Sequence, residues 1–214
     1  PNPFEAQIAN GHRARRFGLV VCAHAAVLIS VRAHDSVVCR VMVFETTVFD
    51  PSDEMPHAGA AVDEWVFAAW TDDAELGVVS GHRVVGRRAW YWSALVQRGH
   101  PLLHLAEWDV RVRSDPFVVK APEMWAEHHC DAPLEQWSIG NEAYFTALDV
   151  ADAALGRCYG TPTPTAMDLE WYATAAPDSV VARSASGFVQ DGVVHGRIEV
   201  ASRGVVDVSE VPAR

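Results

Sequence analysis

The sequence predicts an all-β protein with an antiparallel, barrel-like fold and one short helix. From Asp63 onward, short runs rich in aromatic and β-branched residues recur, and such residues favour the pleated surface of a strand. Turn signals such as Asp72-Asp73 and Gly99-His100-Pro101 separate these runs. Many short strands joined by regular turns are typical of a sandwich or a barrel.

The same pattern predicts the individual elements. A turn at Gly140-Asn141 is expected to separate two strands, and the residues 149–157 read as a helix with Asp149 as its N-cap. The proline-rich stretch 160–164 is expected to end that helix. The expected strands cover residues 63–70, 76–80, 88–96, 102–113, 117–121, 124–129, 136–139, 143–148, 166–173, 193–201 and 205–208.

The stretch 102–113 alternates with a period of two, which predicts a strand with one buried face. His104 and Trp108 share the apolar face in this reading, so His104 is either a hydrogen-bonded core residue or a ligand contact that titrates near neutrality. The expected buried face consists of Leu102, His104, Ala106, Trp108, Val110 and Val112.

Composition limits the classes of partner. Half of the 214 residues are hydrophobic, enough for a substantial core, and the net charge is −11. Lys120 is the only lysine and basic residues form no patch, so we expect no nucleic-acid partner. No apolar run reaches the roughly 18 residues that indicate a membrane span. The four cysteines form no CxxC pair, and we expect reduced, partly buried thiols.

Tryptophan divides the chain in two, because residues 1–60 contain none and all eight lie between Trp65 and Trp171. We therefore expect residues 1–60 to be an N-terminal extension and residues 61–214 to be the barrel domain, truncated at its C-terminus. A basic segment followed by an apolar one at residues 12–33 resembles a secretory signal, with an N-terminal strand pair or helix as the other interpretation. The expected location is cytoplasmic, or secreted if 12–33 is a signal peptide.

The stretch from Glu123 to Thr174 carries the candidate site, since carboxylates alternate there with large aromatic residues. A mostly apolar wall with a few fixed polar points is typical of a small-molecule pocket. Asp168, Glu170 and Tyr172 share one strand face. If that face looks into a barrel, a carboxylic acid with a raised pKa is expected among apolar walls; if it looks outward, these are ordinary solvated acids.

The run Glu127-His128-His129-Cys130 contains metal-ligand types. Neighbours on a strand point to opposite faces, however, so the two histidines cannot bind one ion. No second spaced pair completes a ligand set. We therefore expect no metal site, and one of the two histidines facing the interior as a polar point.

Four stretches together resemble a known family: DEWVFAAW, WYWSALV, APEMWAEHHCDAPLEQWSIGNEAYF and YGTPTPTAMDLEWYAT. They look like the lipocalin-like (calycin) proteins related to hydroxyneurosporene synthase, the carotenoid 1,2-hydratase, and more closely like uncharacterised actinobacterial-type members. The resemblance covers roughly Asp63 to Glu210, and the usual Glu-Trp-Trp-Tyr opening of the family reads Glu64-Trp65-Val66-Phe67 here. It implies a lipocalin-like barrel, one of two in a longer protein, with an apolar isoprenoid or lipid ligand.

Two functions follow as hypotheses, and neither requires a cofactor. The oligomeric state stays open. In the first, the barrel binds an apolar small molecule through aromatic contacts. In the second, the protein is a hydratase or cyclase in which an interior acid protonates an isoprenoid-type alkene. The candidate ligand-binding residues are Trp92, His104, Trp108, Trp125, His128, Trp137, Tyr144 and Trp171. The candidate catalytic residues are Glu127, Glu135, Asp168 and Glu170.

Overall fold

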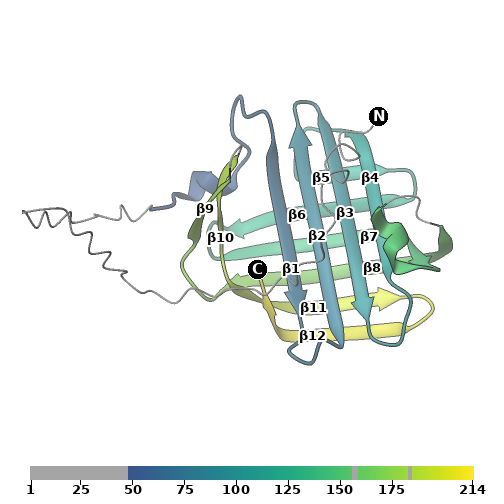
Figure 1. Ribbon diagram of the computed structural model, residues 1–214. Helices are drawn as coiled ribbons and strands as arrows, with labels where there is room; N and C mark the ends of the chain where they lie inside the picture. Colours follow the sequence, from purple (N-terminus) through teal and green to yellow (C-terminus); the bar gives the residue numbers. More distant parts are fainter. Residues whose placement is uncertain (1–47, 156–158, 183–184) are drawn as a thin grey trace, which may run out of the picture. The chain divides into compact units, whose positions relative to one another are not determined.

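The computed structural model describes residues 48–155, 159–182 and 185–214, and these form an all-β, barrel-like fold, as expected from the sequence (Figure 1). The chain from Thr46 to Arg214 forms one compact unit. The barrel unit therefore begins well before residue 61. The segment 12–33, with its two interpretations, lies outside the described residues.

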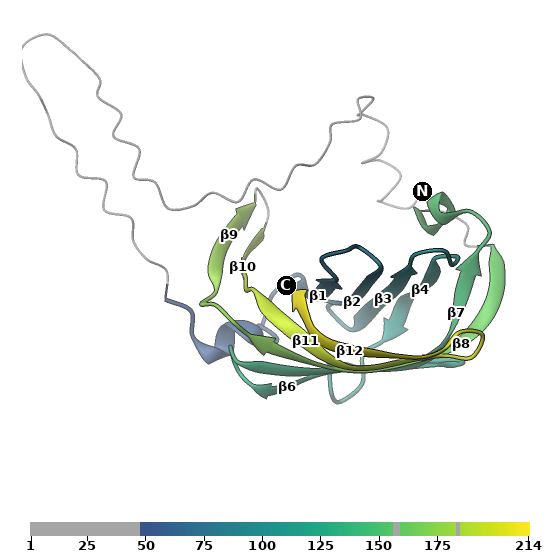
Figure 2. The same cartoon turned by 90° about the horizontal axis from the view of Figure 1, so that it is seen from below.

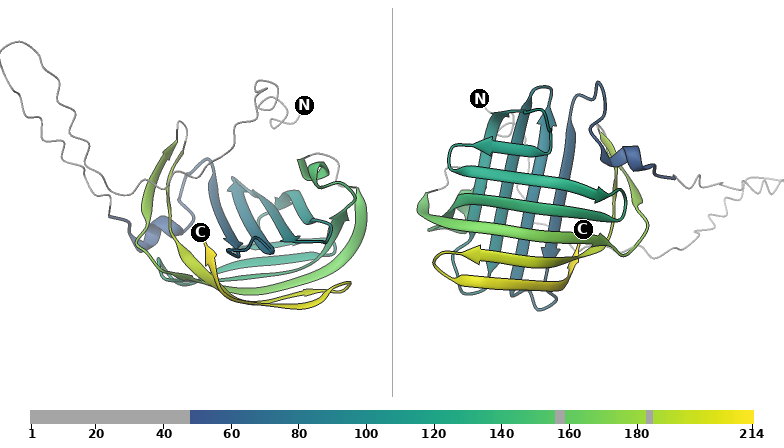
Figure 3. Two further views of the ribbon diagram at one scale, coloured as in Figure 1. Left: turned by 60° about the horizontal axis from the view of Figure 1, so that its bottom comes forward. Right: turned by 180° about the vertical axis from the view of Figure 1, so that it is seen from behind.

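Two layers of antiparallel strands enclose the core, and the strands of one layer run across those of the other (Figures 1 and 3). The first layer is a meander in which each strand pairs with the next. Its strands are β1 (Asp63–Trp70), β2 (Leu76–Val85), β3 (Arg88–Gln97) and β4 (Leu103–Arg111). The second layer contains β5 (Val118–Ala121), β6 (Met124–Ala132), β7 (Gln136–Leu148), β8 (Gly160–Ala173), β11 (Gly192–Val200) and β12 (Gly204–Ala213).

The two layers join at two opposite corners, which closes the sheet on itself. At one corner β1 pairs with β12 through Ala69 and Ala213. At the other, β4 pairs with β7 through Leu103 and Ala147. The ring runs β4-β3-β2-β1-β12-β11-β8-β7 and back to β4, with β6 and β5 continuing beyond β7. Figure 2 shows how the second layer curves around the ends of the first.

Two further pieces stand at the end of the barrel where β1 begins. The 3-10 helix η1 (Pro51–Glu54) starts with a capping box, in which Asp50 accepts from the backbone and Asp53 reaches back to Asp50. A separate hairpin, β9 (Asp178–Ala182) and β10 (Ala185–Val189), projects from the chain between β8 and β11 (Figures 1 and 3). Sequence reasoning predicted neither of these elements.

The core follows from alternation along the strands, because successive side chains point to opposite faces. Trp137, Ile139 and Phe145 of β7 are 0–2 % exposed, whereas Ser138, Glu142 and Tyr144, which alternate with buried residues, face outward. One contiguous cluster of buried apolar side chains fills the barrel. Hydrophobic burial of this kind is the main stabilising term of the fold.

The predicted buried face is wrong for His104, Ala106 and Trp108 and correct for Val110 and Val112, which pack against the core. Leu103 and Leu105 are buried, and their neighbour His104 lies on the outer face together with Trp108. A β-bulge explains the difference, because the register shifts between Ala89 and Tyr91 of the partner strand β3. Asp109, whose φ is +65°, lies in the bulge, where β4 has one residue more than β3. The extra residue exchanges the two faces of the strand, so that beyond it Val110 packs against the core.

The predicted turn at Gly140-Asn141 is also wrong, since β7 runs through it without interruption. Asn141 points inward, and its amide donates to the Tyr91 hydroxyl at 2.8 Å. Gly140 points outward under Trp125, whose ring would lie 3.3 Å from a Cβ at that position. Glycine and asparagine usually indicate a turn, but here they allow close packing on the two faces of β7.

The remaining differences concern the segment between β7 and β8. The expected helix at 149–157 is a 3-10 helix, η2 (Ala151–Leu155), and residues 156–158 lie outside the described residues. The proline-rich stretch 160–164 opens β8 as a strand. β8 pairs with β7 along this stretch, whereas its pairing with β11 starts only at Thr165. Prolines are tolerated there because this part of β8 supplies no N–H donor towards β11; the Pro164 carbonyl only accepts, from the backbone N–H of Ala201 at 3.0 Å.

Candidate functional site

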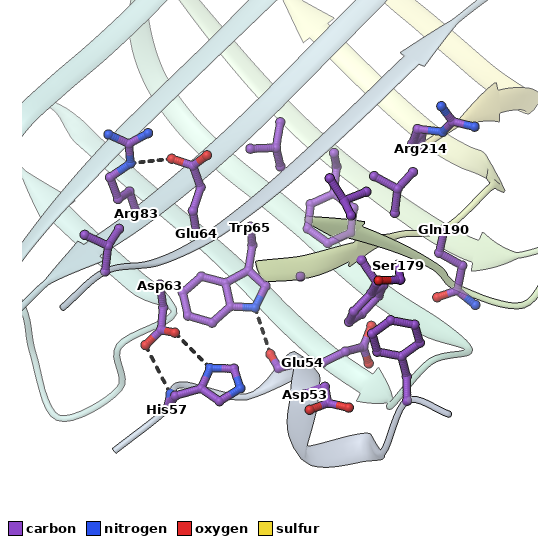
Figure 4. Close-up of a pocket in the computed structure, with 18 of the residues that line it drawn as sticks. Asp53, Glu54, His57, Asp63, Glu64, Trp65, Arg83, Ser179, Gln190 and Arg214 are labelled. Atoms are coloured by element: carbon purple, nitrogen blue, oxygen red, sulfur yellow. Dashed lines mark hydrogen bonds and ion pairs between the residues drawn. The ribbon is translucent and has the colours of Figure 1, made fainter. Parts of the chain in front are cut away.

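A pocket of about 1010 Å³ lies at the barrel end that carries η1 and the β9–β10 hairpin (Figure 4). We call it the mouth pocket. The segment 48–63, the start of β1, the hairpin and the ends of several barrel strands line it. Pockets of this size at the mouths of β-barrels are common sites for small molecules.

Four aromatic side chains form the barrel side of the mouth pocket. Trp65 and Phe67 come from β1, Trp137 from β7 and Trp171 from β8. The Phe67 ring lies 5.5 Å from Trp137 and 6.1 Å from Trp171, measured between centroids. Trp137 and Trp171 are only 1 % and 3 % exposed, so the aromatic wall is held by the core. The contact area that a ligand can reach therefore comes mainly from Trp65 and Phe67, which are only partly buried.

Glu54 closes this end of the barrel from η1. It is 5 % exposed, and its two carboxylate oxygens accept from Trp137 Nε1 at 3.0 Å and from the backbone N–H of Leu134. Its own carbonyl accepts from Trp65 Nε1 at 2.7 Å. The buried charge is therefore compensated by N–H donors, as buried carboxylates require. These bonds fasten η1 to the aromatic wall.

Cys130 on β6 lies beside the same carboxylate, with its sulfur 3.8 Å from Glu54. Burial and the nearby charge of Glu54 raise the pKa of this thiol to about 12. The thiol therefore remains protonated at neutral pH and does not act as a nucleophile. Cys130 is a free cysteine, in keeping with the expected reduced thiols.

The cationic side chains and His57 at the mouth pocket are paired with carboxylates. Asp63 accepts from the His57 ring at 2.8 Å, Glu64 pairs with Arg83, and Arg214 pairs with Asp191 at 2.7 Å (Figure 4). The two arginines are thus neutralised by carboxylates. A ligand entering the pocket meets apolar walls and a rim whose arginines are paired with carboxylates.

Beneath the aromatic wall lies a set of buried polar side chains, which we call the inner polar cluster: Ser80, His82, Tyr91, His128 and Asn141. Ser80 Oγ lies 2.8 Å from His128 Nε2 and 3.0 Å from the Tyr91 hydroxyl. Asn141 donates to the same hydroxyl. Burial raises the pKa of Tyr91, so this group stays neutral and the cluster carries no phenolate.

The two histidines of this cluster lie side by side with ring centroids 5.9 Å apart. Burial lowers the pKa of His82 to about 4, and burial together with His82 lowers that of His128 to about 3. Both rings are therefore neutral at pH 7. Neither ring nitrogen of His82 has a hydrogen-bond partner among the described residues, and the same holds for Nδ1 of His128. Trp65 and Phe67 pack against these rings and separate them from the mouth pocket.

Three of the predicted ligand-binding residues face the interior. Trp137 and Trp171 line the mouth pocket. His128 belongs to the inner polar cluster, while its neighbour His129 is exposed on the opposite face. The structure thus places one of the two histidines inside, as the alternation of a strand requires. Among the described residues, no three His, Cys, Asp or Glu side chains gather where they could hold a metal ion.

The other five predicted ligand-binding residues lie on the outer faces of the sheets. Trp92 and Trp108 stack there at 6.5 Å, with the Arg83 guanidinium 5.9 Å from the Trp92 ring. His104 lies on the same outer face of β4, and burial lowers its pKa. Trp125 and Tyr144 line a second, outer groove of about 690 Å³ over β6, β7 and β8.

None of the four predicted catalytic carboxylates faces the interior. Asp168 and Glu170 alternate with the buried Leu169 and lie on the outer face of β8, the outward alternative of the sequence analysis. Glu170 accepts from Gln136 at 2.9 Å there. Glu127 lies on the outer face of β6, and Glu135 is exposed in the turn before β7. The predicted interior acid is therefore not among these residues.

The carboxyl groups that do face inward were missed by sequence reasoning. Glu54 lies in the segment assigned to the extension, and the capping pattern Asp50-Pro51-Ser52-Asp53 was the available signal for it.

Glu107 is paired across the strands with Tyr91 and shares its inward face. Burial raises the pKa of Glu107. Glu107 does not line the mouth pocket.

Comparisons with known proteins add no relative to this picture. No protein-family model matches the chain, and neither the curated proteins nor the solved structures contain a significant match. The assignment of a function therefore depends on the geometry of the site.

Proposed function

We propose that this protein binds an apolar small molecule in the mouth pocket. The observation that carries the proposal is the aromatic wall of Trp65, Phe67, Trp137 and Trp171 on one side of a pocket of about 1010 Å³. Apolar groups of the segment before β1 and of the hairpin face this wall, including Val62, Val180 and Phe188. Removing an apolar molecule from water into such surroundings is favourable in proportion to the area buried.

The resemblance to lipocalin-like proteins fits this function and remains a proposal. This resemblance implies an isoprenoid or lipid ligand, and the volume of the mouth pocket suits a molecule of that kind. The cytoplasmic location, with the secreted alternative, also remains a proposal. Within the described residues, no helix is both long and apolar enough to cross a bilayer.

The alternative, a cofactor-free hydratase or cyclase, receives less support. Protonation of an alkene needs an acid that faces the substrate from an apolar wall. Glu127, Glu135, Asp168 and Glu170 lie on outer faces or in a turn. Glu54 does line the mouth pocket, but both of its oxygens accept hydrogen bonds from N–H groups. Both oxygens are therefore already engaged by donors of the protein itself.

A fluorescence titration tests the binding function. The probe is N-phenyl-1-naphthylamine, a neutral apolar fluorophore whose emission rises when it leaves water. We expect saturable binding by the whole chain, with about one probe per protein. Val180→Asp places a charge inside the mouth pocket at a side chain that is already 45 % exposed, so the fold should tolerate it.

The matched control is Val96→Asp, at a valine of similar exposure on the outer face of β3. We expect Val180→Asp to weaken probe binding at least about tenfold, because burying an unpaired charge against an apolar ligand is unfavourable. Val96→Asp should leave the affinity unchanged. Equal affinities for all three proteins, or no saturable binding to any of them, would refute the proposed function.

A further inference from the structure

The outer face of the first layer is apolar over almost its whole extent. The strand registers place on this face every second residue from Glu64 to Trp70, from Gly77 to Arg83, from Trp90 to Val96 and from His104 to Trp108. We call this set the apolar outer face, because its polar members are only Glu64, Arg83 and His104. An antiparallel sheet that packs one face on the core usually presents polar side chains on the other. The apolar outer face therefore requires an explanation.

Large side chains of the apolar outer face are open to solvent. In Figure 1, β1 to β4 lie in front of the second layer, with this face turned away from the barrel interior. Val66, Trp70, Val96 and Trp108 are 40–55 % exposed. With strands about 4.8 Å apart and a rise of about 3.4 Å per residue, the face covers on the order of 400 Å². Single exposed apolar residues are common, but contiguous apolar patches of this size are often interaction sites.

Two glycines keep the apolar outer face low. A Cβ at Gly77 would collide with the Trp70 ring, and a Cβ at Gly81 would collide with the Trp92 ring. Because both side chains are missing, the two indoles lie against the sheet. Trp92 also stacks with Trp108, at an angle of 25° between the rings. The face is therefore shaped to pack against another sheet, as in two-layered β proteins.

The few polar groups of the apolar outer face leave it without net charge. Glu64 pairs with Arg83, whose guanidinium also lies 5.3 Å from the Trp90 ring and 5.9 Å from the Trp92 ring. Burial lowers the pKa of His104 from its ordinary value, so this ring is neutral at pH 7. The face is thus neutral in a chain whose net charge is −11.

Charge also decides which partner fits this face. The net charge of −11 is repelled by anionic lipid surfaces and by nucleic acids. On the outer face of the second layer, Glu127, Glu142 and Asp168 would oppose their own copies if two chains met there. Two apolar outer faces bring together only charges that are already compensated. A second copy of this chain therefore offers a matching surface.

We infer that the apolar outer face is the interface of a symmetric homodimer, in which the first layers of two copies pack face to face. A twofold axis brings the same patch of both copies together, and twofold dimers are the commonest oligomers. The area of the face is smaller than that of permanent dimers, so we expect a reversible dimer with a Kd in the micromolar range. The inference goes beyond the proposed function and does not depend on it.

Sedimentation velocity of the whole chain at pH 7, from about 1 to about 200 µM protein, tests the inference. We expect the average mass to rise with concentration from the monomer value of 23.4 kDa towards twice that value. Sodium chloride at about 1 M should not dissociate the dimer, because salt screens the repulsion between two acidic chains and leaves apolar contacts intact. A monomer at all concentrations, growth beyond a dimer, or dissociation by salt would overturn the inference.

Trp108→Glu places an unpaired carboxylate in the interface of each copy. Its matched control is Tyr144→Glu, because Tyr144 is 52 % exposed and Trp108 55 %, and Tyr144 lies on the outer face of the second layer. We expect Trp108→Glu to raise the Kd of the dimer at least about tenfold, since burying an unpaired charge is unfavourable. Tyr144→Glu should leave the Kd within about twofold of that of the natural chain.

A second pair of variants separates the interface from any local effect of losing the Trp108 indole. Val96→Glu changes the apolar outer face, and Val205→Glu on β12 is its control, at side chains that are 40 % and 51 % exposed. We expect the same contrast in Kd, with circular dichroism showing the fold of the natural chain in all four variants. Equal Kd values within either pair would overturn the inference. Trp108 and Val96 do not line the mouth pocket, so such a result would leave the proposed function standing.

Discussion

The Glu54 side chain connects parts of the mouth pocket that lie far apart in the sequence. Its carboxylate accepts from Leu134 and Trp137, more than 75 positions along the chain. Glu54→Gln replaces one acceptor oxygen by an NH₂ group, which leaves a buried N–H without a partner. We expect the free energy of unfolding to fall by about 3 kcal/mol, measured by urea denaturation.

A matched control for this variant is Glu64→Gln on β1. Glu64 pairs with Arg83 in partly exposed surroundings, and exposed ion pairs contribute little to stability. We expect the free energy of unfolding to change by less than about 1 kcal/mol in this variant. Comparable losses in the two variants would contradict the role that we assign to Glu54.

The neutral histidines of the inner polar cluster predict a dependence of stability on pH. The unfolded chain takes up a proton at His82 near its ordinary pKa of 6.5, but the folded chain takes it up only near 4. Between these values the unfolded state binds more protons, so the free energy of unfolding falls as the pH drops from about 6.5 towards 4. Above pH 7 this stabilising contribution is fully present. His128 acts in the same direction, and Asp115 opposes the shift of His82 only in part.

His82→Phe tests this prediction. The ring size is kept and a group that must stay neutral is removed, so we expect a flatter pH profile between pH 6.5 and 4, by about 2 kcal/mol of unfolding free energy. Stability at pH 7 should not fall, because both ring nitrogens of His82 lack partners among the described residues. Parallel profiles for the two proteins in urea denaturation would contradict the burial of a neutral His82.

Among the elements, β11 depends on one glycine at its irregular pairing. Gly196 stands where the register with β12 shifts, at a φ of +135°, and a Cβ there would collide with the backbone oxygen of Asp168 on β8. Gly196→Ala should therefore lower the free energy of unfolding by at least about 2 kcal/mol.

The control for this element is Gly187→Ala in β10, where a Cβ would meet nothing within 4 Å. We expect its thermal midpoint to stay within about 2 °C of that of the natural chain, since the added methyl group has open space. If Gly196→Ala melts at the same temperature as Gly187→Ala, the packing of β8 against β11 is not as the structure has it.

The elements show what alternation can and cannot predict. Strands such as β1 and β3 were placed within one residue, because their aromatic runs and turns are local signals. The bulge in β4 and the continuous β7 depend on partners that are far away in the chain. Asn141 faces inward because of Tyr91, 50 positions earlier, and the bulge at Asp109 is visible only against β3. Local pattern alone therefore assigned the wrong face to His104 and Trp108.

For the whole molecule, the segment before β1 is part of the barrel unit. A chain that starts at residue 61 would lose Glu54 and η1 and would expose Trp65 and Trp137. We expect it to melt at least about 5 °C lower than a chain that starts at residue 46, and to lose binding of N-phenyl-1-naphthylamine. Circular dichroism and the fluorescence titration measure the two effects. Equal melting temperatures would show that residues 46–60 do not support the barrel.

The site was predictable only in part, for a reason that concerns the whole fold. Trp137, Trp171 and His128 face the interior, whereas the acids of the same stretch face outward. The sequence shows which residues alternate, but which of the two faces is inside depends on how the sheet closes. The mouth pocket is built largely from segments outside Glu123–Thr174, namely η1, β1 and the β9–β10 hairpin.

The most direct test of the central claim is a map of amide chemical shifts by two-dimensional NMR, recorded while N-phenyl-1-naphthylamine is added. We predict shifts that change together at the mouth pocket, at Phe67, Val180, Phe188 and Gln190. Changes confined to the outer groove around Trp125 and Tyr144, or to the outer face around Trp92 and Trp108, would contradict binding at the barrel mouth.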